Sequence, residues 1–228
     1  MTVAEATPAS KTPLFFQRRF LPMWTALSFG TFADNTLRQA LLIGIPAGVI
    51  PVPLFSKPDD AMPFIGALLP SAILIFSSVS GQLADKYETS MMFKRTKLTE
   101  LLLMLTAGAA FAFGWGGVAI AMLFAMGAQS AFFSPVRVSA MPKYLAMDEL
   151  VRGNGLCNAG LFTFILLGYV FGGSLIVLPN GGVLVGATLV CASAIGLAAA
   201  WRTPYAAPNA PDLKLSFNGV KQTEFMFR

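Results

Sequence analysis

Residues 98–136 decide the fold: LTELLLMLTAGAAFAFGWGGVAIAMLFAMGAQSAFFSPV. Two apolar stretches, at about 98–113 and 118–136, meet at the glycine turn Gly114–Gly117. A helix that crosses a bilayer needs about 20 mostly apolar residues, and each stretch approaches that length. The turn between them is too short for any connection other than a helical hairpin. The segment therefore predicts two antiparallel membrane-spanning helices.

The composition of the whole chain agrees with a membrane protein. Of its 228 residues, 55% are hydrophobic and only 12% are charged, whereas soluble domains are about 25% charged. Disordered chains are poor in apolar residues, so disorder is excluded as well.

Catalytic chemistry has little support in the sequence. There is no histidine, and the two cysteines, Cys157 and Cys191, lie inside apolar segments. A metal site, a cofactor site and a nucleophile–base pair are all lacking, so we expect no enzyme activity.

Apolar runs on either side of the hairpin bring the predicted number of helices to six. The additional runs cover about 20–50, 62–84, 153–178 and 183–201. Charged residues fill 85–97, which we expect in water, and a second polar loop is expected at 137–152. The predicted organisation is a cytoplasmic tail at 1–19, a transmembrane domain at 20–202 and a proline-rich cytoplasmic linker and tail at 203–228.

The basic residues predict the topology. With the amino terminus inside, six helices leave only Lys57 outside and Arg38 within a helix, among 16 Lys and Arg residues. Inner loops of membrane proteins carry an excess of Lys and Arg, so both termini are predicted to be cytoplasmic. The same asymmetry explains the net charge of +5 without nucleic acid.

Polar residues within the first helix are the main candidates for a transport pathway. They are Asp34, Asn35, Arg38 and Gln39. Charged groups are costly inside a bilayer and usually face a wet cavity or each other. Asp34 and Arg38 are four residues apart and share a helix face, so a purely structural ion pair is the alternative.

Polar residues also occur on later helices. Gln129 is the one polar group of possible pathway interest in the close-packing segment 127–131, and Asn154 and Asn158, four residues apart, form a possible polar ladder. The spacing Gly168-x-x-x-Gly172 favours helix packing rather than ligand binding.

The sequence GQLADK, at 81–86, follows the second helix. Together with 29–35 (FGTFADN), 134–137 (SPVR) and 148–156 (DELVRGNGL), it resembles the lysophospholipid-transporter branch of the major facilitator superfamily. This branch includes free permeases and permeases fused to an acyltransferase and an acyl-ACP synthetase. The resemblance covers about 14–218.

The resemblance implies an all-α fold: the amino-terminal six-helix half of a facilitator bundle, made of two inverted three-helix repeats. It implies transport of lysophospholipids across the bacterial inner membrane by alternating access. Asp34, Asn35 and Asn154 match family positions of the pathway. Gly81, Asp85, Lys86 and Arg137 match the gating loop region, with arginine where lysine is usual. Asn158 and Val138 depart from the family, which usually has an acid and a tyrosine there.

A facilitator needs two six-helix halves, so we expect a second half in cis or in trans. The alternative is a truncated or orphan half that acts as a non-transporting membrane scaffold or docking module. The sequence after residue 218 leaves the family pattern, so a frameshift, an early stop or a cloning boundary is predicted near residue 219. Any acyl-transfer chemistry would belong to fused domains.

Overall fold

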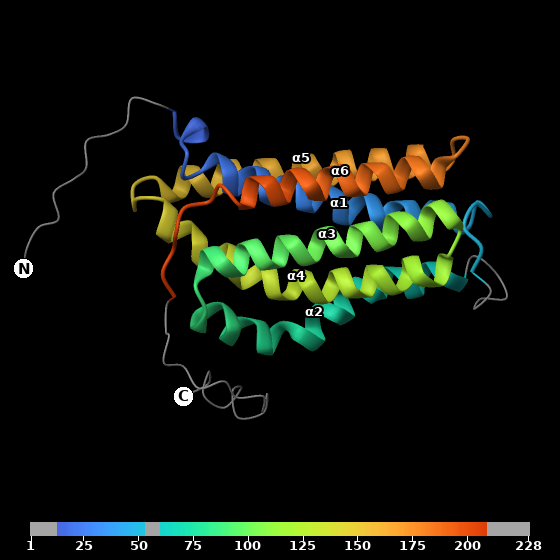
Figure 1. Ribbon diagram of the computed structural model, residues 1–228, viewed down its shortest axis with the longest axis horizontal. Coiled ribbons are helices and arrows are strands. Elements are labelled where there is room, and N and C mark those ends of the chain that lie inside the picture. The colour runs from blue at the N-terminus through green and yellow to red at the C-terminus, as the bar shows by residue number, and fades with distance from the viewer. Residues whose placement is uncertain (1–12, 53–59, 209–228) are drawn as a thin grey trace, which may run out of the picture.

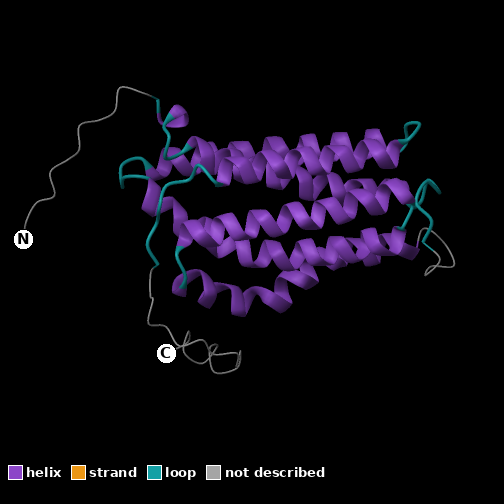
Figure 2. Ribbon diagram, in the orientation of Figure 1, coloured by secondary structure: helices purple, strands orange, loops and turns teal. Residues whose placement is uncertain are grey.

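The computed structural model describes residues 13–52 and 60–208, except the side chains of residues 78, 79 and 85. Within these ranges the chain forms helices and loops only (Figure 2). A short 3-10 helix, η1, covers Leu14–Phe16. Six α-helices follow: α1 (Leu21–Gly44), α2 (Ala61–Lys86), α3 (Thr89–Phe113), α4 (Gly116–Tyr144), α5 (Leu150–Ile176) and α6 (Gly181–Ala200).

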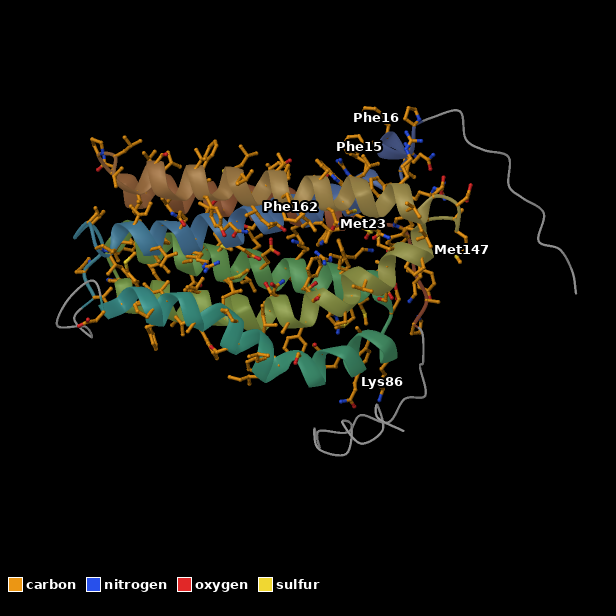
Figure 3. All side chains as sticks on the ribbon, turned by 180° about the vertical axis from the view of Figure 1, so that it is seen from behind. Phe15, Phe16, Met23, Lys86, Met147 and Phe162 are labelled. Carbon is orange, nitrogen blue, oxygen red and sulfur yellow. The ribbon has the colours of Figure 1, made fainter. Side chains whose placement is uncertain are left out.

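The helices run up and down along the long axis of one bundle (Figure 1). The described start of the chain, the α2–α3 connection and the segment after α6 lie at the same end. Lys86, at the end of α2, and Met147, between α4 and α5, also lie there, as Figure 3 shows. The predicted inner loops are therefore gathered at one end of the bundle.

The helix packing repeats itself in two groups of three. Helix α1 packs mainly against α5 and α6, and α4 packs in the same way against α2 and α3. Helices α3 and α6 also pack against each other. If α1, α2 and α3 are exchanged with α4, α5 and α6, this pattern of neighbours is unchanged.

Glycines permit the close approach of helices within these pairs. A Cβ added to Gly168 or Gly172 of α5 would overlap the backbone of α1 at Phe32 or Thr36. A Cβ added to Gly127 of α4 would lie 3.0 Å from the Leu69 carbonyl oxygen of α2. Small residues are a common means of helix association in membranes, and the packing role predicted for Gly168 and Gly172 is confirmed.

Four helices, α3 to α6, are long and apolar enough to cross a membrane by length and composition. The segment Ala61–Ser77 of α2 is a shorter apolar helix. Helix α1 has 24 residues but carries four polar side chains in its middle: Asp34, Asn35, Arg38 and Gln39. Membrane crossing by α1 and α2 stays a prediction.

Two predicted loops are wrong. Residues 137–144 continue α4 through Pro142, and the real connection to α5 is 145–149. Residues 89–97 form about the first two and a half turns of α3, although the helix was expected to begin near residue 98. Helix formation satisfies the backbone there, and Lys97 is almost completely buried.

Candidate functional site

A polar layer divides the apolar interior of the bundle. One apolar cluster contains Met104 and Met126, and the other, toward the bundle end where α2 connects to α3, contains Phe93 and Val136. On α3, Lys97 and Glu100 lie between the two clusters. On α4, the intervening polar residues include Gln129 and Ser130. The sequence therefore interrupts the apolar core at matching heights on two helices.

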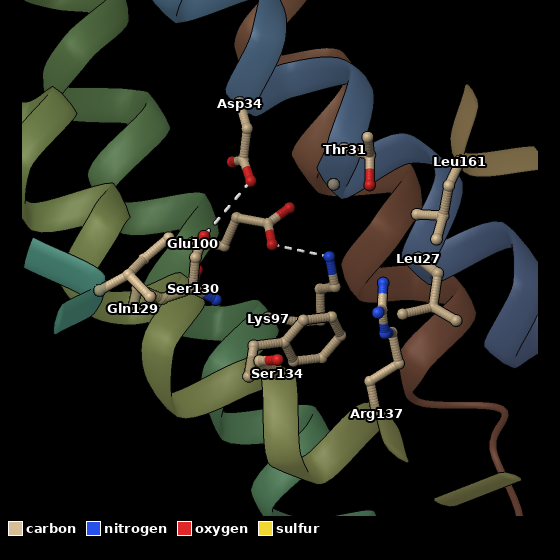
Figure 4. Close-up of a pocket in the computed structure, with 13 residues that line it drawn as sticks. Leu27, Thr31, Asp34, Lys97, Glu100, Gln129, Ser130, Ser134, Arg137 and Leu161 are labelled. Atoms are coloured by element: carbon tan, nitrogen blue, oxygen red, sulfur yellow. Dashed lines mark hydrogen bonds and ion pairs between the residues drawn. The ribbon is translucent and has the colours of Figure 1, made fainter. Parts of the chain in front are cut away.

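A cavity of about 220 Å³ lies in this layer (Figure 4). Its lining comes chiefly from α1, α3 and α4: Leu27, Gly30, Thr31, Asp34, Ile73, Lys97, Glu100, Gln129, Ser130, Phe133, Ser134, Arg137 and Leu161. The four charged groups are two carboxylates and two cations. Such groups are rare among membrane-spanning helices and favour a functional role.

Lys97 and Glu100 form a buried ion pair within α3. The Lys97 Nζ atom donates to Glu100 Oε2 at 2.6 Å, and the side chains are 1% and 3% exposed. The ammonium also lies 4.7 Å from the centre of the Phe133 ring, which gives it a cation–π contact. Removal of either partner would leave an uncompensated buried charge.

Gly30 of α1 makes room for this ion pair. A Cβ added to Gly30 would lie 3.1 Å from each carboxylate oxygen of Glu100 and would collide with Lys97 Nζ. Gly30 also precedes Asp34 by four residues, about one helical turn on the same face. The carboxylates of Asp34 and Glu100 therefore occupy neighbouring positions on the wall of one cavity.

Asp34 points into the cavity (Figure 4). Its Oδ2 atom accepts a hydrogen bond from Ser130 Oγ at 3.4 Å, whereas Oδ1 is buried without a hydrogen-bond partner. Gln129 is also buried, and its Nε2 atom donates to the Thr96 carbonyl oxygen at 3.0 Å. Gln129 thus joins α4 to α3 beside the cavity.

The alternative ion pair between Asp34 and Arg38 is not formed. Asp34 turns toward Ser130 instead, and the Arg38 Nε atom is buried without a hydrogen-bond partner. Asn35 donates to the Thr31 carbonyl oxygen of its own helix at 2.8 Å. Gln39 lies near Gly173 of α5. Asn35, Arg38 and Gln39 are therefore not part of the lining of this cavity.

A second cavity, of about 260 Å³, adjoins the first toward the start of α5. Arg137 lines both cavities, as do Leu27 and Leu161. Asn154 and Asn158 line only the second cavity. The structure thus brings the two asparagines to Arg137 rather than to Asp34.

The predicted gating residues of α2 lie apart from Asp34. Gly81 lines a third, mostly apolar cavity of about 470 Å³ between α2 and α4. Lys86 is the last residue of α2. Asp85 belongs to the same last turn, and its side chain lies outside the described part of the structure.

Lys97 and Glu100 are the site residues that sequence reasoning missed. Glu100 stands inside the apolar stretch 98–113, and Lys97 precedes it by three residues. An acid within an apolar run and a base one turn earlier predict a buried pair, so this signal was present in the sequence. Across residues 13–52 and 60–208, no cluster of three His, Cys, Asp or Glu side chains could hold a metal ion.

Comparison with known proteins gives several similar transporters. "Lysophospholipid transporter LplT" of Pectobacterium carotovorum is 33% identical over 190 residues, which are 82% of this chain and 42% of the relative. LplT of Enterobacter sp. is 30% identical over 162 residues, 70% of this chain and 37% of the relative.

LplT of Escherichia coli O1:K1 is 33% identical over 167 residues, which are 72% of this chain and 37% of the relative. No family model and no solved structure matches. The chain spans about two-fifths of the length of these curated relatives. Over the aligned residues, the chain is homologous to the LplT lysophospholipid transporters.

Proposed function

We propose that this chain is a six-helix half of a transporter that moves lysophospholipids across the bacterial inner membrane. The observation that carries the proposal is the polar cavity between two apolar clusters, in a chain homologous to LplT. Charged side chains are rarely buried in the core of a soluble protein, so four of them lining one cavity among apolar helices favour a functional role. A polar headgroup that passes through a membrane needs such an interior surface.

The charges of the two adjoining cavities suit a lysophospholipid headgroup. Asp34 offers a carboxylate to an amine, and Arg137 offers a guanidinium to a phosphate. Asn154 and Asn158 add neutral amide groups near Arg137. Guanidinium groups bind phosphate through paired hydrogen bonds, so Arg137 is the proposed phosphate ligand.

In this proposal all six helices cross the membrane, and the end of the bundle that holds Lys86 faces the cytoplasm. Lys86 lies at that end (Figure 3), and the excess of basic residues in the predicted inner loops supports the orientation. Gly81, Asp85, Lys86 and Arg137 form the proposed cytoplasmic gating region. The matched packing of α1–α3 and α4–α6 supports two inverted three-helix repeats.

Alternating access requires one half of a transporter to rock against another half. The proposed partner is therefore a second six-helix half, either in the same polypeptide or in another one. We expect transport when this chain is joined to such a half, and no transport when residues 1–228 are expressed alone.

The test is uptake of a labelled lysophospholipid by spheroplasts that lack their own transporter. The protein is this chain joined to a second half from an LplT relative. Asp34→Asn is expected to reduce uptake strongly, whereas Asp60→Asn, at the exposed start of α2, is the matched control. Normal membrane levels with no uptake by the unsubstituted protein would instead favour the non-transporting scaffold.

A further inference from the structure

An apolar groove separates α2 from α4 beside the polar cavity. Helix α2 contains Pro70 and bends away from α4 in its second half (Figure 1), as helices commonly do at proline. The two helices touch near Gly127, where an added Cβ would lie 2.8 Å from the Ala72 Cβ atom and 3.0 Å from the Leu69 carbonyl oxygen. A Cβ added to Gly81, further along α2, would meet no atom within 4 Å. The space that opens between the diverging helices is the third cavity, of about 470 Å³.

The lining of this groove is mostly apolar although it contains four serines. Ser77 donates to the Leu74 carbonyl oxygen at 3.1 Å, and Ser80 donates to the Ser77 carbonyl oxygen at 2.7 Å. On α4, Ser139 donates to the Val136 carbonyl oxygen at 3.1 Å. A serine hydroxyl has a single donor, and in these three side chains the donor is already used within the helix. The groove therefore suits an apolar guest.

The groove is continuous with the polar cavities. Ile73 and Ser134, the fourth serine, line both the groove and the cavity that contains Asp34. Val138 lines both the groove and the second cavity. Arg137, the proposed phosphate ligand, precedes Val138 in the chain and lines both polar cavities. An apolar space and a positively charged group thus lie on either side of a boundary that both share.

We propose that this groove binds the single acyl chain of a lysophospholipid while the headgroup lies at Arg137. The inference rests on the proposed transport of lysophospholipids and adds the site of the chain. A molecule with one headgroup and one acyl chain requires a polar site and an apolar site that adjoin each other. A chain placed in the polar cavity instead would displace water from its charged groups, which is costly.

The shape of the groove favours one chain. Its lining comes from α2 and α4 alone, so it is a gap between two helices rather than a wide chamber. Ser77 and Val138 in its lining are exposed, so a chain can enter from the surface of the bundle. We therefore expect a lysophospholipid to occupy the groove in preference to a phospholipid with two chains.

The test is photochemical labelling of the full chain in nanodiscs made of diacyl phospholipid. The probe is a lysophospholipid with an ethanolamine headgroup and a diazirine within its acyl chain. Mass spectrometry should find labels concentrated in residues 73–81 of α2 and 131–139 of α4. An excess of the unlabelled lysophospholipid should suppress these labels. A diacyl phospholipid with the same diazirine should label the bundle surface, for example at the exposed Phe162, without such suppression.

Gly81→Leu tests the groove directly, because its side chain enters the groove without meeting a neighbouring atom at Cβ. The suppressible labelling of the groove should fall at least about fivefold, as expected when a bulky side chain takes the space of several methylene groups. Gly66→Leu is the matched control, since Gly66 lies on the same helix, its Cβ also meets open space, and it lines none of the three cavities. Circular dichroism and a single elution peak establish that both variants are folded.

Two outcomes would overturn the proposal. One is equal labelling of the groove by the lysophospholipid and diacyl probes without suppression, which would assign the groove to bilayer lipid. The other is unchanged labelling in Gly81→Leu.

A second probe, with its photoreactive group on the headgroup amine, separates this inference from the proposed function. Suppressible labelling around Arg137 by the headgroup probe, without labelling of the groove by the chain probe, would reject the groove alone. If unlabelled lysophospholipid suppresses neither probe, the proposed substrate fails together with the groove.

Discussion

Gly30 on α1 lies directly against the carboxylate of Glu100 on α3: a Cβ placed on Gly30 would be 3.1 Å from both carboxylate oxygens. The absence of a side chain at residue 30 lets the Lys97–Glu100 ion pair fit against α1. It also places the pair next to Asp34, one turn away on the same helix face. The polar layer thus depends on a glycine as much as on its charged residues.

Gly30→Ala is expected to destabilise the folded protein by about 1–3 kcal/mol, because the added methyl group collides with the buried Lys97 Nζ atom. The measurement is thermal unfolding in detergent micelles. Gly66→Ala is the matched control, since a Cβ at Gly66 in α2 would meet no atom within 4 Å. That control should be neutral or stabilising by up to about 1 kcal/mol. Equal effects of the two substitutions would contradict the packing seen at Gly30.

Lys97→Met should cost about 3–5 kcal/mol, because it leaves the Glu100 carboxylate buried without its partner. Arg19→Met breaks a partly exposed ion pair with Glu149 and should cost at most about 1 kcal/mol. Unfolding in micelles compares the two. The double variant Lys97→Met/Glu100→Leu should recover much of the loss, since no charge is then stranded. A double variant less stable than Lys97→Met would count against the ion pair.

Gly172→Val should cost about 3 kcal/mol or prevent folding, because its Cβ would overlap the Thr36 backbone where α5 crosses α1. Gly155→Val, on the same helix, introduces the same side chain into open space. The yield of monodisperse protein after detergent extraction measures the difference. Similar yields from the two variants would show that close contact between α1 and α5 is dispensable.

The segment after α6 is attached to the ends of α3 and α4. The Tyr144 hydroxyl donates to the Pro204 carbonyl oxygen at 2.9 Å, and the Thr89 amide donates to the Ala206 carbonyl oxygen at 3.1 Å. These bonds hold the chain against the end of the bundle beyond the exposed Arg202.

Tyr144→Phe removes one of these bonds, worth about 1 kcal/mol, so local opening should increase roughly fivefold. Trypsin cleavage after Arg202 should accelerate to a similar extent, as followed by mass spectrometry. Tyr205→Phe is the control, because the Tyr205 side chain is exposed. An unchanged cleavage rate in Tyr144→Phe would mean that this bond does not hold the segment.

The sequence was sufficient to predict the six α-helices, because apolar runs long enough to cross a membrane have few alternatives to a helix. The turn Gly114–Gly117 separates α3 from α4 as predicted, although α4 begins within it, at Gly116. Helix ends were less predictable: the charged start of α3 and residues 137–144 of α4 were both assigned to loops. Charged residues indicate which segments are near water, but they do not mark the ends of a helix, because α3 and α4 both extend beyond their apolar runs.

The candidate site was predictable only in part. Asp34 was identified because an acid within an apolar run is costly, and the same reasoning applied to Glu100 would have found it. The alternative, an ion pair between Asp34 and Arg38, is not formed, because residues four apart on a helix share a face without having to pair. Asp34 instead accepts a hydrogen bond from Ser130, a residue of α4.

The sequence by itself determined that the chain is helical and apolar and that its basic residues fall almost entirely in the predicted inner segments, since these properties depend on residue type and spacing. The tertiary structure decided which polar groups meet. Asp34, Glu100 and Ser130 come from three helices, and only the packing of α1, α3 and α4 brings them to one cavity. The partner of a buried charge depends on which groups lie near it in space. Those distances depend on how closely residues such as Gly30 let the helices approach.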